Sequence, residues 1–303
     1  MDSVNPVYPK VLLVIYDFMG GSSGDLSLRQ RLGWSDPSNL AKQFSQDLQL
    51  ASNSYCNYEI VESYVLNGYP VKEDGFRYAR EEYANAWRSR TGFHQPDWAD
   101  YGQIVSSLNL SELVHLRKID EVWLFAGPYA GFYESRMVGP GAFWCNSPPI
   151  EGYESISRRY VIMGFNYERG VGEMLESYGH RAESVMNQVY RKKRGSSNLW
   201  ERFTRHEKTH PGQAEVGTIH FAPNSLRDYD WGNKSSVSSR CDSWLAYPDL
   251  SGQPRLVNCD DWGGGDTRRH HVWWLKRLPR AAGVTGGIAD NWWEYIVDPN
   301  RAD

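Results

Sequence analysis

The sequence predicts an α/β fold: a wound, mostly parallel sheet over about residues 1–190, with a loop- and Trp-rich C-terminal part packed onto it. Three continuous apolar runs, at residues 10–18, 119–128 and 158–166, have the pattern of strands buried on both faces. Segments with helical spacing separate these runs. Strands that alternate with helices are typical of a parallel sheet with crossover helices.

Each element is indicated by its own local pattern. The first apolar run ends at a Gly- and Ser-rich loop, residues 19–25. The helix predicted at 35–52 has an N-cap signature and the helical spacing of Leu40, Phe44 and Leu48. The other predicted elements of this part are a strand at 58–66 and helices at 75–89, 100–118 and 170–186.

The residues after about 195 have a different composition. They are rich in Gly, Asn, Asp, Pro and Trp, and periodicity returns only at HHVWWLKRL (270–278) and NWWEYIV (291–297). We interpret them as loops and short elements that complete one domain, residues 1–303. A domain boundary near residue 195 is the alternative, because 303 residues suffice for one large domain or two modest ones.

Charge and composition exclude several classes of partner and cofactor. The net charge is −4, and the longest basic run is RKKR at 191–194, so we expect no nucleic-acid partner. The longest apolar run is far too short to span a membrane. The loop at 19–25 lacks the lysine of a P-loop and the spacing of a dinucleotide fingerprint, and we therefore expect no nucleotide cofactor.

Four cysteines favour an oxidising compartment. Their even number without CxxC spacing argues against a zinc knuckle and predicts two disulfides, one of them joining Cys241 to Cys259. Few lysines and many Trp, Tyr, Asn and Gly residues are common in secreted proteins that handle glycans. The start of the chain has no signal-peptide pattern, so the prediction is a secreted or extracytoplasmic mature form. Four buried thiols are the alternative.

The predicted helix 170–186 carries an acidic stripe. Glu173, Glu176, His180 and Glu183 fall within an arc of roughly 80°, opposite the apolar side of the helix. One interpretation is a solvated face. The other is a polar face covered by the C-terminal part, since like charges at this spacing are disfavoured and glycines at 172 and 179 admit a close neighbour. In that case Glu176 and His180 form an acid–base or metal pair.

Polar side chains follow three strands of the predicted sheet. Because the carboxyl ends of parallel strands share one edge, we expect Asp17, the loop 127–146 and Asn166 to meet there. The loop combines aromatic side chains with a carboxylate and a guanidinium, which suits a sugar ring or a peptide. Its candidate site residues are Tyr133, Glu134, Arg136, Trp144 and Asn146.

A second motif resembles the zincin signature of zinc peptidases. His206-Glu207-Lys-Thr-His210 matches HExxH, in which two histidines on one helical face hold zinc and the glutamate polarises water. Pro211 disfavours helical geometry at residue 210. The loop 217–233 adds His220 and Asp228, which can complete a metal site or cap turns.

These patterns lead to three functional hypotheses. The first is a secreted hydrolase acting on polysaccharide, in which Glu134 and Glu176 are paired carboxylates and His180 and Glu173 tune them or hold a metal. Arg136, Tyr133, Asn146, Trp144 and Trp273 would bind its substrate. The second is a metal-dependent peptidase or amidase that holds one divalent ion, Zn or Ca, with Glu176, His180 and His220 or with His206 and His210. The third is a non-catalytic carbohydrate-binding protein.

Overall fold

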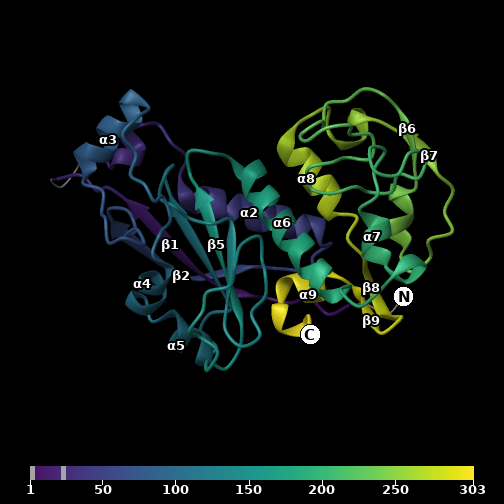
Figure 1. The fold of residues 1–303 in the computed structure, drawn as a ribbon, viewed down its shortest axis with the longest axis horizontal. Coiled ribbons are helices and arrows are strands. Elements are labelled where there is room, and N and C mark those ends of the chain that lie inside the picture. Colours follow the sequence, from purple (N-terminus) through teal and green to yellow (C-terminus); the bar gives the residue numbers. More distant parts are fainter. Residues whose placement is uncertain (1–3, 22–24) are drawn as a thin grey trace. The chain divides into compact units, whose positions relative to one another are not determined.

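The computed structural model describes residues 4–21 and 25–303. The predicted loop at 19–25 and the N-terminal segment therefore lie partly outside the described residues. The described chain forms two compact units (Figure 1). We call Pro9–Gln43 with Tyr58–Gly170 the sheet unit. We call Phe44–Asn57 with Val171–Asp303, together with the N-terminal segment up to Tyr8, the α6 unit.

The two units are interleaved along the chain, since the chain passes between them after Tyr8, Gln43, Asn57 and Gly170. Helix α2 (Pro37–Ala51) begins in the sheet unit and ends in the α6 unit. Interleaved units are compatible with one cooperative domain, and the single-domain organisation stays a prediction. The expected packing of the C-terminal part onto the sheet also stays a prediction.

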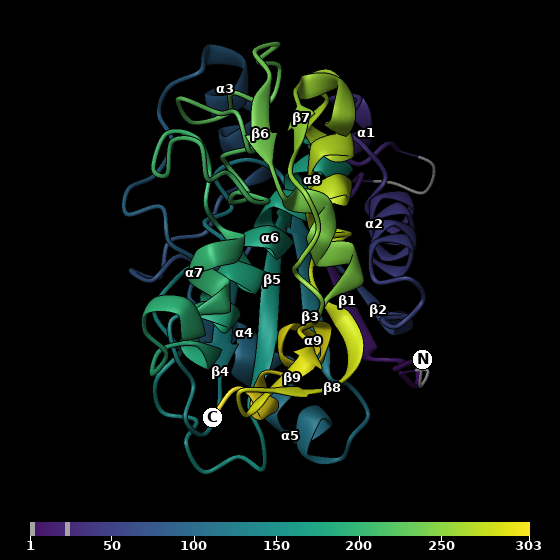
Figure 2. The ribbon, with the colours of Figure 1, turned by 90° about the vertical axis from the view of Figure 1, so that its right-hand side faces the viewer.

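The sheet unit is built on a five-stranded, mostly parallel sheet with the strand order β2-β1-β3-β5-β4 (Figures 1 and 2). Strands β2, β1, β3 and β5 are parallel, and β4 pairs antiparallel to β5 at one edge. The predicted mixed α/β class and mainly parallel sheet are confirmed. The strands are β1 (Lys10–Asp17), β2 (Glu59–Asn67), β3 (Glu121–Ala126), β4 (Ser135–Val138) and β5 (Tyr160–Asn166).

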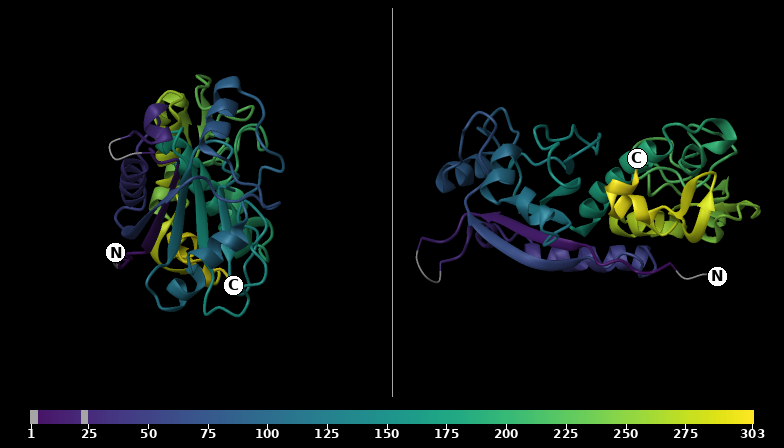
Figure 3. Two further views of the ribbon diagram at one scale, coloured as in Figure 1. Left: turned by 90° about the vertical axis from the view of Figure 1, so that its left-hand side faces the viewer. Right: turned by 90° about the horizontal axis from the view of Figure 1, so that it is seen from below.

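Burial explains the apolar runs. Every residue of β3 is buried, and β1 is buried from Val11 onward, as strands covered on both faces must be. Strand β2, at the other edge, runs alongside β1 and is mostly exposed (Figure 3). Alternate strand residues such as Leu12, Val122 and Ile162 share one core with residues of the short helices. The helices of this unit are α1 (Leu28–Arg31), α3 (Arg80–Ser89), α4 (Tyr101–Ser107) and α5 (Leu110–His115).

Two details of the sheet unit differ from the sequence prediction. The helix expected at 100–118 is split into α4 and α5, because Asn109 adopts a left-handed conformation with φ of 50°. The segment 127–146, expected to be an irregular loop, contains β4. Apolar Met137 and Val138 are buried there and pair with β5, so the Gly-rich flanks hid a short edge strand.

The α6 unit consists of short elements around one long helix, α6 (Val171–Val189). Helices α8 and α9 pack against α6, and two separate two-stranded ribbons, β6–β7 and β8–β9, complete the regular structure (Figure 2). The remaining elements are α7 (Leu199–Phe203), α8 (Thr267–Leu275), α9 (Trp293–Val297), β6 (Val237–Ser239), β7 (Arg255–Val257), β8 (Arg280–Thr285), β9 (Ile288–Asn291) and the 3₁₀ turns η1 (Gly195–Ser197), η2 (Cys241–Ala246), η3 (Cys259–Trp262) and η4 (Pro299–Arg301).

The predicted disulfides are wrong. All four cysteines are buried, and none of them forms a disulfide. In the antiparallel β6–β7 ribbon, Ser239 faces Arg255 and Val237 faces Val257, so Cys241 and Cys259 leave the ribbon at opposite ends. The short loop between them in sequence therefore does not bring them together in space. The predicted extracytoplasmic location consequently rests on composition alone.

Among the described residues, no helix is both long and apolar enough to cross a membrane.

Candidate functional site

The acidic stripe of α6 is neither a fully solvated face nor part of the core. The opposite side of the helix is buried, with Leu175, Tyr178 and Val185 at 0% exposure. The stripe itself is mostly covered, since the side chains of Glu176, His180 and Glu183 keep only 14%, 17% and 20% of their accessible surface. Groups covered to this degree need partners.

The two glycines of α6 explain what covers the stripe. A Cβ atom at Gly179 would lie 2.4 Å from the side chain of Ile219, so only glycine permits this contact. Gly172 is similarly close to Thr267 and Arg268 at the start of α8, at 3.1 and 3.2 Å. Both glycines thus admit a close neighbour from the C-terminal part of the chain. This agrees with the second interpretation of the sequence, in which the stripe is covered.

A tight turn carries His220 to the stripe. The backbones of Thr218 and Phe221 exchange two hydrogen bonds, of 2.9 and 3.2 Å, which leaves Ile219 and His220 at the tip of the turn. Ile219 fits against the surface at Gly179, and its N–H donates to Oε1 of Glu183 at 2.9 Å. The turn is therefore docked on α6 by both packing and a hydrogen bond, next to His180.

Three ligand atoms converge where the turn meets the helix. Nε2 of His220 lies 3.0 Å from Nε2 of His180 and 3.0 Å from Oε1 of Glu176. All three atoms lie within 4.8 Å of one another, a spacing that suits one metal ion. Among residues 4–21 and 25–303, this is the only group of at least three His, Cys, Asp or Glu side chains with such geometry. Glu173 is not part of it.

Carboxylates orient both histidines. Nδ1 of His180 lies 3.1 Å from Oε2 of Glu183, and Nδ1 of His220 lies 3.7 Å from Oδ1 of Asp228. A carboxylate only accepts hydrogen bonds, so Glu183 favours the proton of His180 on Nδ1 and a lone pair on its Nε2. Nε2 of His220 lies 3.0 Å from this lone pair and 3.0 Å from Oε1 of Glu176, and without a metal ion it donates its proton toward these two acceptors. A metal ion would take the place of that proton, with both Nε2 atoms and Oε1 as its ligands.

The electrostatics of Glu176 favour its charged form. Burial by itself raises the pKa of Glu176, but the hydrogen bond with His220 and the charges of His271, His220 and His180 outweigh it. The pKa of Glu176 therefore lies below its ordinary value, and the group is a carboxylate at neutral pH. An ionised carboxylate beside two imidazoles is a complete ligand set for a divalent cation.

A neutral histidine borders this cluster. Nδ1 of His271 donates to the carbonyl oxygen of Gly172, one turn before Glu176 on α6, so the lone pair is on Nε2. Nε2 is buried and has no hydrogen-bond partner. Burial lowers the pKa of His271 to about 4, against the opposing effects of the Gly172 carbonyl and Glu176. His271 thus adds an uncharged base near the ligand cluster.

The cluster opens into a pocket of about 330 Å³. Its walls come from α6, from α7 and from the 218–221 turn, and they combine polar and aromatic groups. The lining residues include His180, Asn187, Trp200, Thr204, His220 and Phe221. A small molecule can therefore reach the two histidines from solvent.

The candidate residues Glu134 and Arg136 belong to the sheet unit, whereas Glu176 belongs to the α6 unit. Asn146 donates a hydrogen bond from Nδ2 to Oε2 of Glu134. The Arg136 guanidinium donates to the carbonyl oxygens of Pro148 and Pro149, each at 3.0 Å. The predicted pairing of Glu134 with Glu176 stays a prediction.

Only part of the predicted convergence at the sheet edge is found. Asp17 and Asn166 end parallel strands and lie at the same edge. Strand β4 instead runs back along β5, with Arg136 opposite Ile162, near the middle of β5. The antiparallel pairing therefore carries Arg136 away from the edge where the sequence analysis placed it.

The predicted stacking residues have different exposures. Trp144 is 60% exposed, and Tyr133 stacks on Trp98 with ring centroids 4.4 Å apart. Trp273 is buried at 8% exposure, and its ring faces the Arg277 guanidinium at 3.8 Å. A sugar can thus reach Trp144, while the Trp273 ring is already covered.

The HExxH segment does not form a helical zinc site. Helix α7 ends at Phe203, and residues 206–210 form turns. The N–H of His210 donates to the carbonyl oxygen of His206 at 2.9 Å, which closes one isolated helical turn despite Pro211. The His206 ring is buried against Phe221, whereas the His210 ring is partly exposed and faces Glu201 at 3.4 Å. Among the described residues, neither histidine belongs to a group of three possible metal ligands.

Three site residues were outside the predicted site set: Glu183, Asp228 and His271. The sequence analysis included Glu183 in the stripe, three residues after His180. On a helix this spacing places the two side chains next to each other, so it indicates a carboxylate that can orient the histidine. The sequence analysis noted Asp228 on the same loop as His220, whereas the contact of His271 depends on tertiary structure and local sequence carries no signal for it. No family model matches this chain, and no curated protein or solved structure matches it significantly.

Proposed function

We propose that this protein is a metal-dependent hydrolase whose metal centre is formed by Glu176, His180 and His220. One observation carries the proposal: Oε1 of Glu176 and the Nε2 atoms of both histidines converge within 4.8 Å. The carboxylates of Glu183 and Asp228 on the opposite ring nitrogens support it, because metal-bound histidines are usually held in this way.

The donor set favours zinc. Two imidazole nitrogens and one carboxylate oxygen are the ligands of many catalytic zinc sites, which keep a fourth position open for water. A calcium ion would require six to eight oxygen ligands, and this cluster is nitrogen-rich. The same set can also bind Fe(II), and metal analysis distinguishes the two ions.

A zinc ion here would supply a nucleophile for hydrolysis. Bound zinc lowers the pKa of water to about 7 and polarises a carbonyl group. The pocket of about 330 Å³ beside the histidines leaves room for the group that water attacks. Peptidase or amidase chemistry is therefore the reaction class that we propose.

Glycan hydrolysis by paired carboxylates has less support. It requires a second carboxyl group about 5–10 Å from Glu176. Its candidate Glu134 belongs to the other unit and bonds to Asn146, and Glu176 is already engaged with His220. A metal-dependent reaction instead requires Glu176 to lie beside His180 and His220, as it does.

Carbohydrate binding by the sheet unit is a second candidate function. The exposed rings of Trp98 (44%) and Trp144 (60%), the former stacked on Tyr133, offer apolar faces of the kind that sugar rings contact. Loss of glycan binding in Trp144→Ala, with an unchanged melting temperature, would support this function. Unchanged glycan binding in that variant would contradict it.

Metal analysis tests the main proposal. The wild type and the variants His180→Ala, His220→Ala and His206→Ala are purified without chelator and dialysed, and their metal content is measured. We expect about one zinc per chain in the wild type and in His206→Ala, and none in the other two variants. Circular dichroism checks that each variant is folded.

The outcomes separate the alternatives. Retention of zinc by His180→Ala with loss in His206→Ala would overturn this site in favour of the HExxH segment. Iron in place of zinc would contradict the hydrolase. If the purified wild type contains no metal and does not bind added zinc, the proposal is overturned. The two histidines would then share a proton and no metal ion. Activity on ester and amide substrates is measured with Glu176→Gln, for which we expect a loss of at least about 100-fold.

A further inference from the structure

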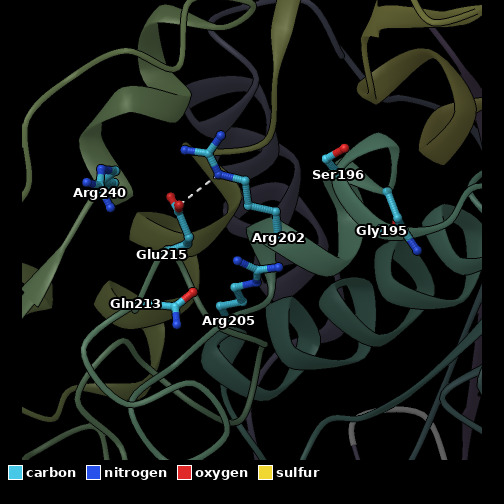
Figure 4. A pocket seen from close by; sticks show the side chains of 8 residues that line it. Gly195, Ser196, Arg202, Arg205, Gln213, Glu215 and Arg240 are labelled. Carbon is cyan, nitrogen blue, oxygen red and sulfur yellow. Dashed lines mark hydrogen bonds and ion pairs between the residues drawn. The ribbon is translucent and has the colours of Figure 1, made fainter.

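A second pocket of the α6 unit is lined by three arginines and one carboxylate. Its volume is about 430 Å³, within the range of small-molecule sites. Figure 4 shows Arg202, Arg205 and Arg240 around Glu215. The wall therefore carries an excess of positive charge.

Both oxygens of the Glu215 carboxylate accept a hydrogen bond from a neighbouring side chain. Oε1 accepts from Nε of Arg202 at 2.8 Å, and Oε2 accepts from Nε1 of Trp244 at 2.9 Å. Glu215 is buried, so this ion pair is part of the structure of the pocket wall.

Arg205 binds both carboxylate oxygens of Glu201, at 3.2 and 3.1 Å, so Arg240 is the remaining cation of the wall. Its backbone N–H donates to Ala214 at 3.1 Å, which holds it beside Gln213 and Glu215. Within the described part of the chain, its guanidinium has neither a hydrogen bond nor an ion pair, although the residue is only partly exposed. A guanidinium group presents a fork of donors that matches a carboxylate or a sulfate.

The rest of the wall points to a hydroxylated ligand. Ser196, Asn198 and Gln213 add hydroxyl and amide groups, and the lining contains no apolar side chain. The hydroxyl and amide groups can bond to the hydroxyl groups of a sugar, and the aliphatic parts of the arginine side chains can contact its ring. We propose that this pocket binds an acidic saccharide and that Arg240 holds its oxyanion.

The two pockets border the same helix. Trp200 and Thr204 line the histidine pocket, whereas Asn198 and Arg202 line the arginine pocket from the other side of α7. A helix with its side chains is about 10 Å across, so the pockets are about that far apart. Helix α7 lies between the two pockets, so the saccharide site at Arg240 is separate from the proposed metal centre and does not depend on it.

Calorimetry on metal-stripped protein tests the binding site by itself. The probes are a uronate trisaccharide, a sulfated trisaccharide and a neutral trisaccharide. We expect an acidic probe to bind at least about tenfold more tightly than the neutral one. Arg240→Gln should weaken the binding of this acidic probe by about tenfold or more, and Arg240→Lys should weaken it less. The better of the two acidic probes identifies the oxyanion as a carboxylate or a sulfate.

Two controls make the result specific. Arg88→Gln removes one charge from the exposed surface of the sheet unit, and we expect it to bind as the wild type does. Gln213→Ala changes an exposed wall residue and should also weaken binding of the acidic probe. It replaces Arg240→Gln in the test if that variant cannot be purified. Equal affinities for acidic and neutral probes, or unchanged binding in Arg240→Gln, would overturn the proposal. Because no metal is present, this outcome is independent of the proposed hydrolase.

Discussion

Gly179 and Ile219 lie so close that a Cβ atom at residue 179 would come within 2.4 Å of the Ile219 side chain. His220 follows Ile219 directly, and His180 follows Gly179 directly. The contact between the apolar side chain and the glycine surface therefore sets the 3.0 Å separation of the two Nε2 atoms. The geometry of the candidate metal centre thus depends on a packing contact that includes none of its ligands.

We expect Gly179→Ala to lower both the stability and the metal affinity of the protein. Alanine is favoured over glycine in a helix by about 1 kcal/mol, but overpacking typically costs about 1–3 kcal/mol and displaces the 218–221 turn. Chemical denaturation measures the stability, and a competitive zinc titration measures the affinity.

A double-mutant cycle with Ile219→Ala separates the clash from the helix effect. The double variant should be more stable than the sum of the single changes predicts, because the shorter side chain removes the contact. Gly232→Ala is the control, since a Cβ there would meet its nearest neighbour at 3.8 Å. Additive effects in the cycle would show that the contact does not set the position of the turn.

We expect Glu183→Ala to reduce zinc affinity by about 10- to 100-fold. Glu183 holds Nδ1 of His180 and the N–H of Ile219, so its loss frees both the ring and the turn. Zinc titration measures the effect, with Glu173→Ala on the same helix as the matched control. Equal affinities for the two variants would mean that Glu183 does not orient His180.

The stability of the metal-free protein should fall as the pH decreases from about 6.5 to 4. The pKa of buried His271 is about 4, below its ordinary value of 6.5, so the unfolded chain binds more protons in this window. The contribution of His271 to the free energy of unfolding is therefore complete above pH 6.5. Below pH 6.5 this contribution falls by up to about 1.4 kcal/mol per pH unit, roughly 3 kcal/mol in all. Burial also lowers the pKa of His270, which acts in the same direction.

His271→Asn isolates this contribution. The asparagine amide can still donate to the Gly172 carbonyl but does not titrate in this range. The stability of the variant should depend less steeply on pH than that of the wild type when both are measured by urea denaturation. Parallel pH profiles would exclude His271 as the titrating group.

Thiol titration should find four cysteines after unfolding under non-reducing conditions. All four are buried, so the native protein should react with few or none of them. Two disulfides in non-reducing mass spectrometry would contradict the structure around the β6–β7 ribbon.

Strands β1, β3 and β5 were predictable because they are buried on both faces and therefore carry continuous apolar runs such as Val11–Tyr16. Strand β2 is mostly exposed and was predicted from its alternating pattern. The four parallel strands and α6 are found within a few residues of their predicted bounds. Strand β4 was not predictable, because four residues between glycine-rich flanks carry too little periodicity. The cysteine prediction failed because the register of a ribbon cannot be read from the distance along the chain.

The sequence analysis named the three candidate ligands, Glu176 and His180 on the helix and His220 on the loop, but not the contacts that bring the loop to the helix. The spacing of Glu176, His180 and Glu183 places them on one face, and Gly179 marks a close neighbour. Nothing local identifies Ile219 as that neighbour or His271 as the histidine bonded to Gly172. Such contacts join residues far apart in sequence, where periodicity carries no information.

The interleaving of the two units has a consequence for synthesis on the ribosome. Phe44 packs against Tyr178, with ring centroids 5.9 Å apart, and Asp47 binds Arg268, which follows it by 221 residues. At a synthesis rate of about 5–20 residues per second, Arg268 is added to the chain roughly 10–40 s after Asp47. Before α6 (Val171–Val189) has been synthesised, the apolar face of α2 has no α6 to pack against, so the nascent chain needs protection from aggregation. A fragment beginning at residue 171 would lack that face of α2 altogether and should not fold by itself.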